Sequence, residues 1–170
     1  EMNLQPVPNH NPEAPLCPGA ESVVTNLFTD GLEVSAANWS FSALTGSSRW
    51  SRDNFYAHTG QYSLVANDFP AATSDSVAAM TSSVLLPAGA YLHFDHAYGF
   101  DSTGPDGGVV EYSTDNGVNW VNAAGLVQVN GYNGTITAGP LSGSASFIGD
   151  SHGYISTRLL LSPLAAQSVR

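Results

Sequence analysis

The residues of this chain that could do chemistry are carboxylate, imidazole and hydroxyl groups in one alternating segment and several loops. The segment "HFDH" places His93 and His96 three positions apart. Side chains alternate between the faces of a strand, so His93 shares a face with Asp95 while His96 points the other way. The two histidines therefore cannot bind one ion from a regular strand, and His93 with Asp95 forms at most part of a polar site.

A second candidate is Ser151, which is followed directly by His152 in "GDSHG". A catalytic serine needs a base and an orienting acid placed around it in space, and adjacency in sequence does not supply them. The sequence has no G-x-S-x-G motif and no sign that Ser151 is activated. We therefore predict no catalytic residue, and a small hydrolase is the least supported function.

The octet "STDNGVNW" fits the pattern S-x-D-x-G-x-x-W, with Ser113, Asp115, Gly117 and Trp120 in the fixed positions. Asn116 followed by Gly117 is a strong hairpin signal, because both central residues of a type I′ turn need positive φ. The side chains of Asp115 and Ser113 can accept hydrogen bonds from backbone N–H groups of the turn. We expect a structural hairpin, with Trp120 packed over it or in the core.

Several carboxylates stand in loops beside Gly, Ser, Thr or Asn. Calcium takes six to eight oxygen ligands, and such loops offer both carboxylate and carbonyl oxygens. The sequence has no D-x-D-x-D-G loop, so solvated turn carboxylates are the open alternative. The candidate ligands are Asp30, Asp68, Asp75, Asp101 and Asp106.

Aromatic side chains among polar neighbours are candidates for ligand binding. We expect Trp50, Tyr56 and Tyr132 to lie in loops and to be exposed. An exposed ring beside polar groups can stack on a sugar and hydrogen-bond to it, or pack against a protein. Trp39 lies in an alternating run and is expected in the core.

These residues must be positioned by strands. Short apolar or alternating runs recur between Gly, Pro, Asn and Asp, which predicts an all-β antiparallel sandwich or barrel. Residues 1–20 hold five of the ten prolines and are predicted to form an extended arm or linker, with the domain over residues 21–170. The predicted strands are "SVVTNLF", "NWSFSAL", "QYSLVAN", "SVAAMTSSVLL", "AYLHFDHAYGF", "GVVEYS", "NWVNAA", "SASFIG" and "YISTRLLLS", followed by a loop with one helical turn in "PLAAQSV".

Charge excludes one class of partner. Four Lys and Arg residues stand against 14 Asp and Glu, a formal net charge of −10. Binding to a phosphate backbone needs clustered basic residues, so we expect no nucleic-acid partner. No apolar run approaches the roughly 20 residues that span a bilayer, so no membrane insertion is expected. A low charged fraction of 11% with many polar turn residues favours a secreted β protein.

The blocks "LPAGAYLHFDHAYGFDSTGPDGGVVEYSTDNGVNWVNA" and "FIGDSHGYISTRLLLSPLAAQSVR", after "FTDGLEVSAANWSF" and "HTGQYSLVAND", resemble accessory β-jelly-roll domains. These MAM-like domains accompany secreted bacterial metalloproteases of the immune-inhibitor A and fungalysin-like groups, and the resemblance covers roughly residues 24–170. The octet is similar to the Asp-box, a folding motif. The resemblance implies a jelly-roll sandwich and one structural Ca²⁺, held first by Asp30, Asp68 and Asp75 and second by Asp101 and Asp106.

In such domains one or two further strands follow the block matching "LAAQSVR". We therefore expect that residues 21–170 lack the last strand or strands, unless they form an unusual complete domain, and the pairing of Cys17 stays open. The expected function is a non-catalytic, secreted accessory or adhesive domain, stabilised by calcium, that binds an extracellular protein or glycan. The alternative is a structural subunit that self-assembles or accepts a strand from another chain through its arm or an open sheet edge.

Overall fold

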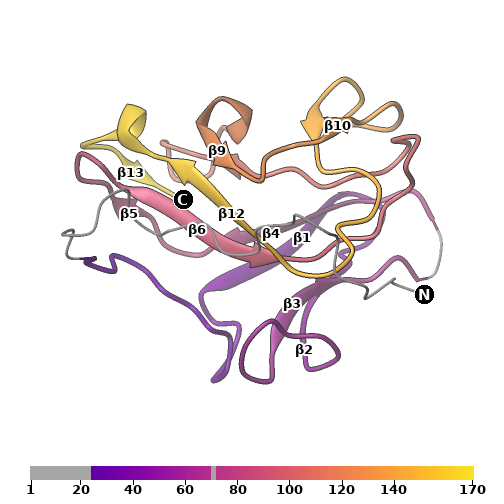
Figure 1. Ribbon diagram of the computed structural model, residues 1–170, viewed down its shortest axis with the longest axis horizontal. Coiled ribbons are helices and arrows are strands. Elements are labelled where there is room, and N and C mark those ends of the chain that lie inside the picture. Colours follow the sequence, from indigo (N-terminus) through magenta and orange to yellow (C-terminus); the bar gives the residue numbers. More distant parts are fainter. Residues whose placement is uncertain (1–23, 70–71) are drawn as a thin grey trace. The chain divides into compact units, whose positions relative to one another are not determined.

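The computed structural model describes residues 24–69 and 72–170, and it is all-β (Figure 1). The predicted arm over residues 1–20 lies outside the described residues. The remaining chain divides into two compact units, residues 26–84 and residues 85–169. The all-β prediction is confirmed, and the sheets whose registers are given below are antiparallel.

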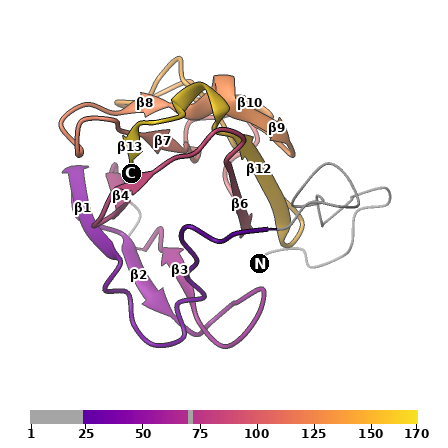
Figure 2. The same cartoon turned by 90° about the vertical axis from the view of Figure 1, so that its left-hand side faces the viewer.

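The unit of residues 26–84 contains two antiparallel pairs of strands. Its strands are β1 (Trp39–Thr45), β2 (Trp50–Asp53), β3 (Ser63–Ala66) and β4 (Asp75–Met80). Strand β1 pairs with β4, with Trp39 opposite Met80 and Phe41 opposite Ala78, and β2 pairs with β3. The two pairs can be followed in Figure 2. Trp39, Phe41 and Ala43 are half-buried while Ser40 is exposed, so the predicted alternation along β1 is confirmed.

The unit of residues 85–169 is built around β12. Its elements are β5 (Val84–Leu85, at the boundary), β6 (Tyr91–His96), β7 (Glu111–Tyr112), β8 (Val121–Asn122), β9 (Val127–Val129), β10 (Gly134–Thr135), β11 (Ala145–Ser146), β12 (Ile155–Leu160) and β13 (Ser168–Val169), with short 3₁₀ helices η1 (Ala123–Leu126) and η2 (Ser162–Leu164). Strand β12 lies between β6 and β9, and β6 and β12 run side by side in Figure 1. The pairs β7–β8, β10–β11 and β5–β13 complete the unit.

The buried core lies in the second unit. Leu159, Ala123, Ile136 and Phe147 are almost fully buried there. Every described side chain that is fully buried, apolar or polar, belongs to residues 85–169, and between residues 24 and 84 the described side chains are half-buried or exposed. Burial of apolar surface is the main stabilising term in folding, so the first unit depends more on other interactions.

Some predicted elements are wrong. Residues 24–28 of the first predicted strand form no strand, and the run "SVAAMTSSVLL" forms two strands, β4 and β5. Strands β2, β9, β10 and β13 were not predicted, and Ser168–Val169 of β13 falls in the stretch expected to be a loop with one helical turn. Each of these strands has four residues or fewer, too few for the two-residue period to stand out from the flanking sequence.

Candidate functional site

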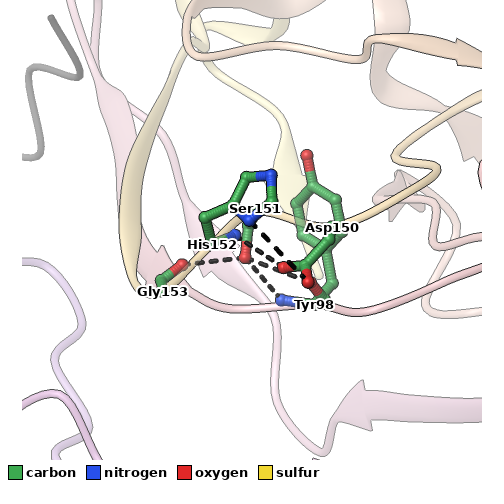
Figure 3. Close-up of polar contacts among 5 residues, drawn as sticks. All are labelled: Tyr98, Asp150, Ser151, His152 and Gly153. Carbon is green, nitrogen blue, oxygen red and sulfur yellow. Dashed lines mark hydrogen bonds and ion pairs between the residues drawn. The ribbon is translucent and has the colours of Figure 1, made fainter. Parts of the chain in front are cut away.

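Ser151 lies in a tight turn between an isolated bridge and β12 (Figure 3). Its Oγ accepts a hydrogen bond from the N–H of Tyr98 at 2.9 Å and lies 2.8 Å from the carbonyl oxygen of Gly153 and 3.2 Å from that of Tyr98. The N–H of Ser151 donates to the Tyr98 carbonyl at 2.9 Å. The hydroxyl therefore ties the turn to the end of the β6 segment, using its one proton and an acceptor position on backbone groups.

The neighbouring imidazole is turned toward Asp150. The Nδ1 atom of His152 is 3.9 Å from Oδ2 of Asp150, and its backbone N–H donates to Oδ1 at 2.6 Å (Figure 3). Burial raises the pKa of Tyr98, with a smaller contribution from the charge of Asp150. The side chains of Ser151 and His152 thus interact with different groups. In this arrangement Ser151 stabilises the turn and is not activated as a nucleophile.

The octet forms a closed hydrogen-bond network around one carboxylate. Oδ1 of Asp115 accepts from the Ser113 hydroxyl at 2.8 Å and from the N–H groups of Val118 and Asn119 at 3.1 and 2.9 Å. Oδ2 accepts from Nδ2 of Asn119 at 2.6 Å, and Ser113 Oγ accepts from the N–H of Gly117 at 2.8 Å. The Asn119 N–H, then its amide and the Ser113 hydroxyl, lower the pKa of Asp115 to about 2. These hydrogen bonds all join residues of the octet, which agrees with its predicted structural role.

The geometry of this hairpin differs from a two-residue turn. Asn116 and Gly117 do have positive φ, 61° and 87°. However, Tyr112 is paired with Val121, so the connection comprises residues 113–120. Over this longer loop, side-chain acceptors replace the hydrogen bonds of a strand ladder. The Asn-Gly signal for a two-residue turn therefore predicts the positive φ angles but not the length of the loop. Trp120 is half-buried.

The predicted separation of the "HFDH" side chains is confirmed by the sheet register. His93 is opposite Arg158 and Asp95 is opposite Ser156 on one face. The hydroxyl of the buried Ser156 donates to Oδ1 of Asp95. The Nε2 atom of His93 is buried and has no hydrogen-bond partner in the described part of the chain.

His96 lies on the opposite face, among aromatic rings. Its ring centroid is 4.5 Å from that of Phe147 and 4.9 Å from that of Phe94. Its Nε2 is 2.8 Å from Oγ1 of Thr157, whose own proton goes to the carbonyl of Asn130 at 2.7 Å. Thr157 must then accept, so Nε2 of His96 carries the proton. Burial lowers the pKa of His96 to about 4 against a smaller opposing effect of Asp95, which makes it a neutral core histidine at pH 7.

The five predicted calcium ligands are divided between the two units. Asp30, Asp68 and Asp75 belong to one unit and Asp101 and Asp106 to the other. Within the described residues no three His, Cys, Asp or Glu side chains gather closely enough to hold a metal. Only Asp101 and Asp106 are linked, because Oδ1 of Asp106 accepts the N–H of Asp101 at 2.8 Å. Asp101 in turn accepts from the hydroxyl and N–H of Thr103, which lower its pKa.

The carboxylate of Asp30 accepts hydrogen bonds from neighbouring residues at both oxygens. Its Oδ1 accepts the N–H of Leu32 at 2.7 Å, and its Oδ2 accepts Nδ2 of Asn38 and Nε1 of Trp39, both at 3.0 Å. Partial burial raises the pKa of Asp30, but these hydrogen bonds outweigh it, so the net shift is downward. Positively polarised N–H groups face both carboxylate oxygens, which is an unfavourable setting for a cation.

A polar clamp continues from this loop to the β2–β3 hairpin. Arg52 donates to the carbonyls of Leu32 and Glu33, and its guanidinium carbon lies 3.3 Å from the centroid of the Tyr62 ring. Oε1 of Glu33 accepts the N–H groups of Gln61 and Tyr62 at 2.9 and 3.1 Å. Charge-assisted hydrogen bonds thus hold a unit that has no fully buried side chain among its described residues.

The three aromatic residues predicted to bind a ligand differ from the prediction in their position or their exposure. Trp50 opens strand β2 and is not in a loop, and its Nε1 donates to the Ser76 carbonyl at 3.1 Å. Tyr132 is half-buried against Phe147, and its hydroxyl both donates to and accepts from the backbone of Val110. Tyr56 lies in the β2–β3 connection and is half-buried.

Sequence reasoning missed the most exposed apolar side chains. Val34, Phe55 and Phe69 expose 96%, 86% and 83% of their surface, and all three belong to residues 26–84. Phe55 stands among polar residues in "RDNFYAH", the same signal that predicts exposure of the neighbouring Tyr56. The candidate site is therefore the apolar surface of this unit.

Comparisons with known proteins leave the fold description as it stands. No family model matches the chain, and neither the curated proteins nor the solved structures contain a match. Among the described residues, no helix has the length and apolar character needed to cross a membrane.

Proposed function

We propose that the chain is a non-catalytic accessory or adhesive domain of a secreted bacterial protein, associated with a protease. In this proposal the chain is an antiparallel jelly-roll domain of MAM-like type that binds an extracellular protein or glycan. The resemblance of the sequence blocks supports the family, and the antiparallel pairing of the strands is compatible with it.

The observation that carries the binding role is the contrast between the two units. Residues 85–169 enclose a core, whereas residues 26–84 present Val34, Phe55 and Phe69 to solvent and leave Trp39 and Trp50 half-buried. Aromatic side chains are enriched at interfaces, because they bury a large area at a low cost in conformational entropy. A partner that covers them would remove this apolar surface from water.

The polar groups favour binding over catalysis. Ser151 is engaged by backbone groups of Tyr98 and Gly153, and Asp115 by the turn that it closes. His96 is held neutral in an aromatic environment. The sequence motifs that resembled chemistry thus have structural tasks.

We also propose a calcium ion, held by fewer residues than the sequence predicts. Asp101 and Asp106 lie in one loop with their Oδ1 atoms engaged by neighbouring donors, while their Oδ2 atoms accept no hydrogen bond from the described residues. These two residues would hold the ion, and Asp30 would not, because N–H groups face both of its oxygens. A bound Ca²⁺ would stabilise the loop of residues 101–106 electrostatically.

The test is a binding assay with matched variants. The full chain would be applied to a glycan array and to immobilised extracellular matrix proteins, alongside a Phe55→Ser, Phe69→Ser double variant. Val118→Ser is the control, because Val118 is also exposed (77%) but lies in the Asp-box loop of the other unit. We expect the double variant to lose at least tenfold in affinity, about 1.4 kcal/mol, and the control to keep it. No binding on either surface, or equal binding by all three proteins, would overturn the proposal.

A second candidate function is a structural subunit that assembles through strand exchange. The two-stranded sheets of residues 26–84 favour it, because each such pair has outer edges without a described neighbour. Size-exclusion chromatography with light scattering over a hundredfold concentration range tests it. Concentration-dependent oligomers would support it, and a monomer throughout would exclude it.

A further inference from the structure

We infer that the outer edge of β1 is a docking site for an extended, positively charged segment of another polypeptide. This inference goes beyond the proposed binding function, because it concerns the backbone edge of β1 and not the exposed side chains of Phe55 and Phe69. It is carried by the backbone geometry of β1, by the composition of the strand and by the charge of its unit.

The first step is the direction of the backbone groups. The N–H of Thr81 donates to the carbonyl of Asn38 at 2.8 Å, and Ser40 is opposite Ala79 in the same register. Hydrogen-bonded and non-hydrogen-bonded pairs alternate in an antiparallel ladder. The backbone groups of Ser40 and Ser42 therefore face β4, and those of Phe41 and Ala43 face away from it.

Independent contacts agree with this assignment. The N–H of Trp39 turns away from β4 and donates to the carbonyl of Ala36 at 2.9 Å. On β4, the carbonyl of Ser76 faces away from β1 and accepts Nε1 of Trp50. Within the described residues, no backbone hydrogen bond is formed by the outward groups of Phe41 and Ala43.

The second step is the absence of edge protection in this strand. At seven residues β1 is longer than the other strands of the structure's described part, and its sequence WSFSALT has no charged residue and no proline. Natural edge strands usually carry Lys, Pro or inward charges that prevent pairing. A bulge interrupts the register only near the end, between Ala43 and Thr45. The edge is thus a template for an added strand.

The third step is the pattern that the incoming strand must have. Trp39 and Phe41 are half-buried on one face of β1, while Ser40 and Ser42 are exposed on the other. Cross-strand neighbours on the same face pack against each other. An added strand would therefore need apolar side chains beside Trp39 and Phe41 and polar side chains beside the two serines.

The final step is charge. Residues 26–84 contain five acidic residues and two arginines, a formal charge of 2 − 5 = −3, and Arg170 of the same unit makes it −2: Asp30, Glu33, Asp53, Asp68 and Asp75 against Arg49 and Arg52. Both arginines are engaged within the unit, Arg52 by carbonyls and the Tyr62 ring, and Arg49 by the Ala72 carbonyl. A cationic segment is attracted by this field, whereas a second copy with the same net charge is repelled.

The experiment uses the full chain and two peptides. One has the sequence Lys-Val-Thr-Val-Lys-Val-Thr-Val-Lys, and the other carries Glu in place of each Lys. Affinity would be measured by fluorescence anisotropy, with amide shifts of Phe41 and Ala43 as the site readout. We expect the Lys peptide alone to bind, and Ser42→Lys to weaken it about fivefold while Ser42→Glu strengthens it. Val118→Lys adds the same charge at an exposed position outside β1, and its effect measures the contribution of net charge alone.

Ala43→Pro tests the edge itself. This substitution removes only an outward N–H, so the β1–β4 ladder and the circular dichroism spectrum should persist while peptide binding is abolished. Ser42→Pro removes an N–H that faces β4 and should disrupt the ladder.

Equal binding of both peptides, or binding by a folded Ala43→Pro variant, would overturn the inference. So would a dimer that Ala43→Pro abolishes, since a second copy would then occupy the edge. If the Lys peptide does not bind but the array binding that depends on Phe55 and Phe69 is observed, this inference alone is refuted. If the Lys peptide binds but the array shows no binding that depends on Phe55 and Phe69, the proposed function is refuted as stated.

Discussion

Acidification should destabilise the protein between pH 6.5 and 4 through one buried imidazole. His96 packs between Phe94 and Phe147, and burial lowers its pKa from 6.5 to about 4. The folded pKa is lower than the unfolded one, so in this window the unfolded chain binds a proton that the folded chain does not. Stability is therefore fully present above pH 6.5 and is lost as the pH falls toward the folded pKa.

The size of this effect follows from the two pKa values. With 6.5 unfolded and about 4 folded, the linkage relation gives a loss of about 2 kcal/mol at pH 5 and about 3 kcal/mol at pH 4. Acidic groups whose pKa is lowered in the folded state, such as Asp115, titrate below their ordinary value of 3.8 and contribute mainly below this window. The loss between pH 6.5 and 4.5 is thus assigned to His96.

Urea unfolding followed by circular dichroism at pH 7, 6, 5 and 4.5 measures the effect. The informative variant is His96→Gln, whose amide can still donate to Thr157 but does not titrate. It should be less stable at pH 7 and lose much less stability on acidification, while His152→Gln, at an exposed position, should follow the wild-type profile. Parallel pH profiles for the wild type and His96→Gln, or a His96 pKa near 6.5 by NMR, would refute the reasoning.

Three further predictions concern the remaining polar contacts. Gly60→Ala should cost about 1–2 kcal/mol by urea unfolding, because φ is +68° and a Cβ would clash with Oε1 of Glu33; an unchanged midpoint would contradict the clamp. Tyr132→Phe should cost about 1–3 kcal/mol, since the N–H of Val110 loses its partner while the Val110 carbonyl keeps the N–H of Ala123; a neutral change would mean that water replaces the hydroxyl. Asp115→Ala should lower the melting temperature at pH 7 but produce little difference near pH 2, where the wild-type carboxylate is itself becoming protonated; an equal loss at both pH values would show that its charge is unimportant.

Local patterns in the sequence were enough for the all-β class, for the alternation along β1 and for the octet. In each case the deciding interactions lie within a few residues. Asp115 reaches Asn119 four positions away, and alternation in β1 follows from the pleat of a single strand. The opposite faces of His93 and His96 follow from the same rule.

Only the tertiary structure decided what the candidate residues do. Ser151 is engaged by Tyr98, 53 residues away, and Tyr132 by Val110, 22 residues away, so neither role was readable from neighbours in sequence. The burial that lowers the pKa of His96 likewise comes from β12 and Phe147.

The open edge of β1 also required the register with β4, 39 positions away at Ser40 and Ala79. The sequence alone determined the all-β class, the alternation along β1 and the turn of the octet. Long-range pairing and burial determined which polar groups are engaged and which backbone edge remains for a partner, because both depend on segments that meet only in the folded chain.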